Sequence, residues 1–154
     1  MAQLRAQLIL PVSVKEMAKD VSEYLPFLKP GIKTKELVIF TQTFDLLTWL
    51  LPRCDRFPKN QRFVVTHRLQ CAALDFQEAI FEANAQAGPK RLEYLISADA
   101  CQNKLRLYLR LSRHLKWLSG GHYEHASRMV ASIGRLLGGW IKQTRSSGAR
   151  SAPR

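Results

Sequence analysis

Basic side chains recur at helical spacing in the second half of this chain, and their pattern is the one most suggestive of chemistry. Two sets stand out: Arg106, Arg110 and Arg113, followed by Arg128, Arg135 and Lys142. Within each set the spacing places every member on one side of a helix, so each set forms a row of cations. A planar guanidinium pairs with phosphate oxygens and equally well with carboxylates. The two rows therefore predict a binding surface whose partner is RNA, DNA or an acidic protein.

The distribution of charge supports that interpretation. The chain has 154 residues and a formal net charge of +12. Residues 89–142 hold ten Lys or Arg and three acidic residues, a balance of +7, whereas residues 36–88 are close to neutral. Such asymmetry is typical of proteins that bind a polyanion. The alternative is a soluble domain that is merely basic.

We find no set of residues that predicts catalysis or a bound cofactor. His122 and His125 flank Glu124 at the start of a helical stretch, but no second set of metal ligands accompanies them. The Glu-x-x-His pairs of di-metal helical bundles, the phosphate-binding P-loop and the Gly-x-Ser-x-Gly nucleophile motif do not occur. The expected protein is therefore not an enzyme and has no metal site. A metal-dependent bundle enzyme remains the less favoured alternative.

A helix is predicted over residues 34–51, capped by Thr34 and ended by Pro52. Its seam alternates spacings of three and four: Leu37, Phe40, Phe44, Leu47 and Leu51. Apolar residues occupy the rest of the circumference as well, and such a helix must be buried on more than one side. We therefore expect a homo-oligomer with Val38, Leu46 and Trp49 at the subunit interface.

Three further helices are predicted, over about 59–87, 90–118 and 123–142. The apolar arc of the third is also wider than packing within one chain requires. With short turns and no strand-like alternation, the fold class is all-α, an antiparallel four-helix bundle over 34–142. Residues 1–33 are expected to form a partly irregular N-terminal extension, and 143–154 a basic, disordered tail. Gly138–Gly139, inside the last helix, indicates close packing.

Asp75, Glu78 and Glu82 form an acidic strip on the second predicted helix. It is either a solvated face or a docking strip for arginines of a neighbouring subunit. Cys54, Cys71 and Cys101 are odd in number and widely spaced, without a CxxC pair. Cys71 and Cys101 lie in helical patterns where a small apolar residue fits, which favours buried free thiols in a reducing cytoplasm. The apolar stretches are too short or too polar to span a bilayer, so we expect a cytoplasmic protein without membrane contact.

The chain resembles the accessory variability determinant proteins of diversity-generating retroelements, which belong with the four-helix-bundle proteins encoded in 23S rRNA intervening sequences. The resemblance covers about 35–142, and its most specific segments are FPKNQRF (57–63), YEHA (123–126) and IGRLLGGWIK (133–142). The segment ELVIFTQTFDLLTWLLP (36–52) favours the retroelement branch over the ribosomal one. Neither residues 1–33 nor the Gly120–Gly121 turn matches the family pattern.

The resemblance implies a homopentameric barrel of four-helix bundles with a positive surface and no catalysis of its own. It also implies that the protein binds the retroelement's reverse transcriptase and template RNA. In that role it supports mutagenic cDNA synthesis, which diversifies a target gene during mutagenic retrohoming. Arg106, Arg110, Arg113, Arg128 and Arg135 are the positions that fit the family's surface cations. Two alternatives remain: an RNA-binding protein of the 23S rRNA intervening-sequence type, and a generic oligomeric scaffold.

Overall fold

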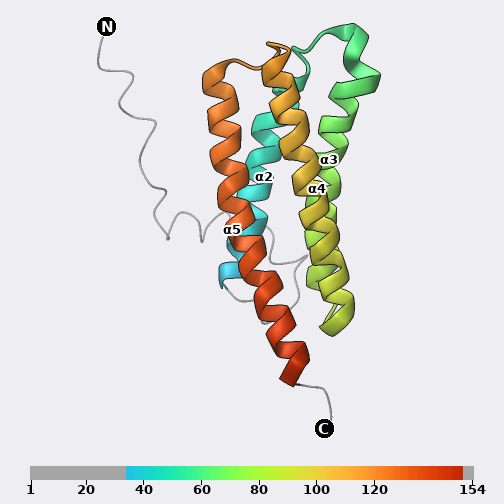
Figure 1. Ribbon diagram of the computed structural model, residues 1–154, viewed down its shortest axis with the longest axis vertical. Helices are drawn as coiled ribbons and strands as arrows, with labels where there is room; N and C mark the ends of the chain where they lie inside the picture. The colour runs from blue at the N-terminus through green and yellow to red at the C-terminus, as the bar shows by residue number, and fades with distance from the viewer. Residues whose placement is uncertain (1–33, 151–154) are drawn as a thin grey trace, which may run out of the picture.

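Four long helices lie side by side and antiparallel in the computed structural model, which describes residues 34–150 and their side chains over 37–148 (Figure 1). They are α2 (Thr34–Cys54), α3 (His67–Ala85), α4 (Gly88–His114) and α5 (Gly120–Arg150). A 3₁₀ turn, η2 (Lys59–Gln61), and a π-helical turn, η3 (Arg62–Thr66), connect α2 to α3. No strand occurs between 34 and 150, so the predicted four-helix bundle is confirmed. The expected N-terminal extension, 1–33, lies outside the described residues.

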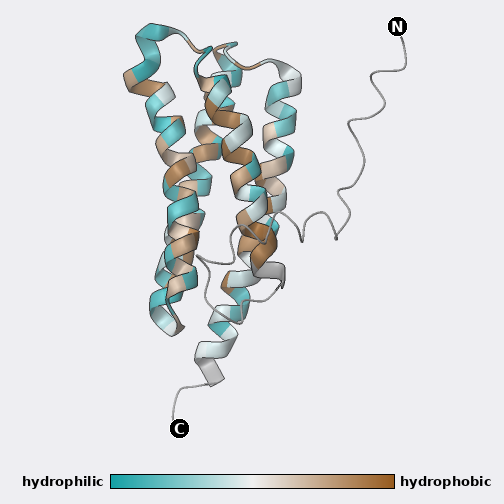
Figure 2. Cartoon of the chain, turned by 180° about the vertical axis from the view of Figure 1, so that it is seen from behind, coloured by the Kyte–Doolittle hydropathy of each residue, from teal (hydrophilic) through white to brown (hydrophobic). Residues whose placement is uncertain are grey.

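One apolar core runs along the axis of the bundle. Each helix contributes one stripe to it, with Ile39 and Leu50 from α2, Leu69 from α3, Leu105 from α4 and Ile133 from α5 all fully buried. Figure 2 shows hydrophilic and apolar positions alternating around the helices, as this one-sided burial requires. Neighbours in the chain pack against each other, and α5 closes the ring by packing on α2. Consequently the two boundaries of α5 are with α4 and α2.

The helix α2 passes through Pro52 instead of ending before it, which corrects the predicted boundary. Proline lacks an amide hydrogen and costs a helix most when it sits in the interior. Pro52 lies only two residues before the end of α2, where a proline destabilises a helix little, and its ring is exposed to solvent. In the same turn, Nη1 of Arg53 donates a hydrogen bond to the carbonyl of Trp49 at 2.6 Å. The helix therefore continues to Cys54.

The helix α4 ends earlier than predicted, at His114, because Lys116 adopts a left-handed backbone conformation with φ of 62°. The amides of Trp117 and Leu118 then turn back to donate to the carbonyl of Ser112. Ser119 caps the start of α5, because its Oγ accepts a hydrogen bond from the amide of His122 at 3.2 Å. The fourth helix therefore starts before the predicted Tyr123.

The expectation of a disordered segment from residue 143 is wrong for residues 143–150. The helix α5 continues to Arg150, and Thr144 is buried against the bundle. A helix that is already nucleated extends at little cost, and Thr144 adds tertiary packing beyond Trp140. Residues 151–154 lie outside the described part of the chain.

Of the two cysteines predicted from the helical pattern to be buried, Cys101 is buried and Cys71 is not. Cys54 and Cys101 are free and buried, while Cys71 is half-buried beside His67. Burial is the main cause that raises the pKa of the Cys54 thiol, to about 12, with the charge of Asp55 adding to it. Burial likewise raises the pKa of Cys101. None of the helices within 34–150 is long and apolar enough to cross a membrane.

Two leucines of α3 test the assignment of the core because the same substitution can be made at both. Leu69 is fully buried and Leu74 is 40% exposed. Leu69→Ala should lower the free energy of unfolding by about 2–5 kcal/mol, since it leaves a cavity. Leu74→Ala should cost about 1 kcal/mol or less. Urea denaturation measures both; equal losses would contradict the packing described here.

Candidate nucleic-acid interface

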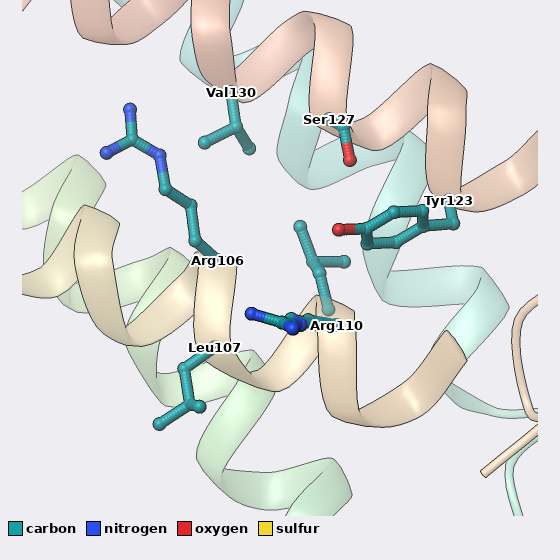
Figure 3. A pocket seen from close by; sticks show the side chains of 7 residues that line it. Arg106, Leu107, Arg110, Tyr123, Ser127 and Val130 are labelled. Atoms are coloured by element: carbon teal, nitrogen blue, oxygen red, sulfur yellow. The ribbon is translucent and has the colours of Figure 1, made fainter. Parts of the chain in front are cut away.

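Arg106, Arg110 and Arg113 lie along the boundary between α4 and α5. A groove of about 360 Å³ opens there, lined by Arg106, Leu107, Leu109, Arg110, Tyr123, Ser127 and Val130. Figure 3 shows Arg106 and Arg110 projecting from α4, with Tyr123 and Ser127 opposite them on α5. The Arg113 guanidinium lies nearer the end of the bundle, next to Gly120. The first predicted row is therefore brought together in space, and we call these three residues the α4 arginine row.

The position of Arg106 is set by a buried amide. Gln102 is 1% exposed, and its Nε2 donates to the carbonyl of Val130 on α5 at 3.0 Å. Nη2 of Arg106 donates to Oε1 of Gln102 at 3.2 Å, and Nη1 donates to Oδ1 of Asn103 at 3.0 Å. One face of the guanidinium is thus anchored by neutral acceptors. Among the described side chains, both hydrogen-bond acceptors of Arg106 are neutral amide oxygens, so its positive charge is not compensated by a carboxylate.

Gly134 provides the space in which this network fits. A Cβ atom at Gly134 would lie 2.7 Å from Nη2 of Arg106, closer than real Cβ contacts, and 3.0 Å from Oε1 of Gln102, which is a tight contact. The guanidinium of Arg106 therefore rests directly on the backbone of α5. Neither Gln102 nor Gly134 was singled out from the sequence. The available signal was a lone glutamine among apolar seam residues, between Ala98 and Leu105.

The second predicted row does not merge with the first at Arg128. That residue lines a different groove, of about 340 Å³, on the α2 side of α5, together with Gln42, Asp45, His125, Met129 and Ser132. Arg128 also pairs with Glu124 at 3.7 Å, but both side chains are about 70% exposed, so water screens the pair. Arg135 and Lys142 follow at intervals of seven and are exposed on the outer ridge of α5. The first row therefore lies on α4, at its boundary with α5, whereas Arg128 lies on the opposite side of α5, toward α2.

The three residues expected at a subunit interface differ in burial. Leu46 is 1% exposed in the core of its own chain, so its assignment to an interface is wrong. Trp49 is half-buried, with the Arg53 guanidinium 4.0 Å from its ring centroid and the His125 ring at 4.9 Å. Val38 is also half-buried. The sequence pattern misled because a helix contacting two neighbours buries a wide arc within one chain.

His122 and His125 pack as aromatic rings on Trp49. Partial burial is the main cause that lowers the pKa of His125, and the charges of Arg128, Arg53 and His122 lower it further. The neutral ring is thereby favoured. Among the described side chains no group of three or more His, Cys, Asp or Glu residues could hold a metal ion.

The glycines Gly138 and Gly139, expected at a close contact, face open space, since a Cβ at either would meet nothing within 4 Å. That expectation is therefore wrong within the chain. Both positions are exposed on the outer side of α5, one and two residues before the buried Trp140.

These glycines provide a matched test of the Arg106 anchor. Gly138→Ala should raise the free energy of unfolding by about 0.5–1 kcal/mol, because alanine is the better helix former. Gly134→Ala should lack that gain, because its methyl group displaces Arg106 and crowds Gln102. Chemical denaturation measures both energies, and NMR of the Arg106 side-chain nitrogen reports its displacement. Equal gains with unchanged Arg106 signals would refute the anchor.

Comparison with known proteins identifies one family. The model of the bAvd-like family, the bacterial accessory variability determinants, matches residues 37–144, which cover most or all of each of the four helices and both basic rows. No curated protein matches the chain. Because the match spans most of the chain and the whole bundle, this chain belongs to the bAvd-like family.

Proposed function

We propose that this protein is a non-enzymatic accessory factor of a diversity-generating retroelement, one that binds the reverse transcriptase and its template RNA. The family supports the retroelement role. The α4 arginine row is the observation that carries RNA binding: three guanidinium groups line one helix boundary, and no acidic side chain lines the groove between them. Phosphates, spaced regularly along a strand, suit such a row.

The groove chemistry favours a nucleic acid over an acidic protein. Tyr123 and Ser127 add hydroxyl groups opposite Arg110. Hydroxyl groups bind phosphate and sugar oxygens. The lining side chains come from both helices, with Arg106 and Arg110 on α4 and Tyr123 and Ser127 on α5 (Figure 3). An RNA strand therefore has a path along α4 and α5.

Charge reversal of the row tests this proposal. The triple variant R106E/R110E/R113E should lose RNA binding, while circular dichroism and light scattering remain as in the wild type. For the wild type, the logarithm of the binding constant should fall with the logarithm of salt concentration, by about 0.7 for each phosphate contacted on a single strand. Fluorescence anisotropy with a labelled RNA measures both.

The second row supplies the matched control. The variant R128E/R135E/K142E changes the net charge by the same amount, but from the outer ridge and the α2 side of α5. It should weaken binding less than the α4 variant, through the general field alone. Equal losses in the two variants would show that net charge matters and the groove does not. RNA affinity that survives reversal of the α4 row would overturn the proposal.

We also propose that the protein assembles into a homo-oligomer, a pentamer by family resemblance. Support comes from α4, where Leu107 is 60% exposed, Leu115 is 41% exposed and Leu111 between them is half-buried. Spacings of four place these leucines on one stripe outside the core. The exposed acidic strip of Asp75, Glu78 and Glu82 on α3 adds an opposite charge with which a neighbour's arginines can pair. We therefore propose that the subunit interface includes α4, whereas the sequence pattern placed it on α2.

Light scattering at micromolar concentration checks the oligomer. The variant L107D/L115D should give a folded monomer, because carboxylates are costly to bury in an interface and harmless on a free surface. Leu46→Asp should instead unfold the chain, since Leu46 lies in the core. A monomeric wild type would refute the assembly, and an unchanged oligomer in L107D/L115D would refute the α4 interface.

A further inference from the structure

The turn between α2 and α3 carries the most exposed large apolar side chain of the described residues. Phe63 is 84% exposed and Val64 is 56% exposed, both in the π-helical turn η3. A phenylalanine so placed costs free energy in water, because its ring has no apolar neighbour to cover it. Short π-helical turns frequently occur at functional sites. The ring is therefore positioned for a partner.

The surroundings of Phe63 are cationic. Residues 53–68 contain five arginines or lysines and one acid, namely Arg53, Arg56, Lys59, Arg62, Arg68 and Asp55. Arg56, Lys59 and Arg62 are exposed on the same short connection. An interface with an apolar protein surface would bury these charges at high cost. An exposed ring among cations is instead the combination with which proteins hold unpaired nucleotides, by stacking on bases and pairing with phosphates.

A small polar hollow adjoins the turn. It has a volume of about 240 Å³ and is lined by Cys54, Asp55, Phe57, Pro58, Arg62, Thr66 and Gln70. Thr66 is 5% exposed, and its hydroxyl has no hydrogen-bond partner. An unsatisfied buried hydroxyl is costly, and a ligand that supplies a hydrogen bond removes that cost. Sugar and base edges carry many such groups.

The turn lies at the end of the bundle where α4 passes into α5, so it shares an end with the top of the α4 arginine row (Figure 1). The ring contact between Phe57 and Trp117, with centroids 5.6 Å apart, ties the two connections together. Arg113, the last member of the row, sits beside Gly120 at that same end. A strand bound along the row is thereby led toward the turn.

We propose that η3 is a stacking site for unpaired RNA bases, with Phe63 as the platform and Arg56, Lys59 and Arg62 as phosphate contacts. The proposal rests on the RNA binding proposed above and names the form of RNA selected: single-stranded, as opposed to duplex. Bases in a duplex are stacked on each other and present no free face to Phe63. The α4 row binds backbone phosphates in either form, so selectivity for single strands comes from the turn.

The test compares a short single-stranded RNA with a duplex of the same length, using the full chain. Phe63→Ala should weaken single-strand affinity about tenfold, because one base–aromatic stack is lost, and leave duplex affinity unchanged. Phe63→Trp should restore single-strand binding. Ile96→Ala is the matched control, since Ile96 is a 49% exposed apolar residue on α4, outside the turn, and should change neither affinity.

Two further measurements separate the site from a structural role. With 2-aminopurine in the RNA, binding to the wild type should quench its fluorescence, and binding to Phe63→Ala should not. Thr66→Val should weaken RNA binding and raise the stability of the free protein, because the unpartnered hydroxyl is removed. Higher stability with unchanged RNA affinity would place the hollow outside the site.

Each remaining outcome is decisive. If Phe63→Ala binds single strands as the wild type does, while reversal of the α4 row abolishes binding, the stacking site is wrong and the proposed function stands. If the wild type binds no RNA, the proposed function fails, and the stacking site with it. If Phe63→Ala dissociates the oligomer in light scattering, the ring is a contact between copies and the stacking site is overturned.

Discussion

The hydrogen bond from the buried Gln102 amide to the carbonyl of Val130 is the interaction on which the arrangement of the basic surface depends. It joins α4 to α5 at a point surrounded by apolar side chains, where an amide without a partner would destabilise the fold. The same amide then offers its oxygen to Arg106. Core packing and placement of a surface cation are therefore coupled through one side chain. The absence of a side chain at Gly134 leaves room for both.

This coupling explains why the two basic rows are unequal. The α4 row points toward α5 and is held by Gln102, Asn103 and the space over Gly134 and Gly120. An anchored guanidinium loses less side-chain entropy on binding than a free one, since part of its freedom is already lost. The row on α5 faces outward, and Arg128 is shared with Glu124. Arg106 of the first row is thus anchored by hydrogen bonds, whereas Arg128, Arg135 and Lys142 of the second row are exposed on α5.

The two ends of the bundle also differ in how their cations are held. At the end holding the α3–α4 turn, Arg91 donates to the carbonyls of Ala83 and Gln86 and lies over the ring of Trp140, so its cation serves the fold. At the opposite end, the connection from α2 to α3 leaves an aromatic ring and several cations exposed. Charges that stabilise the bundle are anchored to carbonyls, whereas charges available to a partner cluster beside Phe63 and the α4 row.

The sequence by itself determined the four helices, their antiparallel order and the two basic rows. Helical periodicity records these features locally, through the spacing of Leu105 and Leu109 on one face and of Arg106 and Arg110 on another. Periodicity did not determine that α2 continues past Pro52 or that α5 continues past residue 143. Those helix ends depend on the hydrogen bond from Arg53 to Trp49 and on the packing of Thr144. Leu46 shows the limit most clearly. Periodicity states that a face is apolar, but only the packing of α2 against two neighbours decides whether that face meets its own chain or another. The surroundings of Arg106 and Arg128 were likewise set by tertiary structure, since Gly134 of α5 lies against the Arg106 guanidinium and Asp45 of α2 lines the same groove as Arg128.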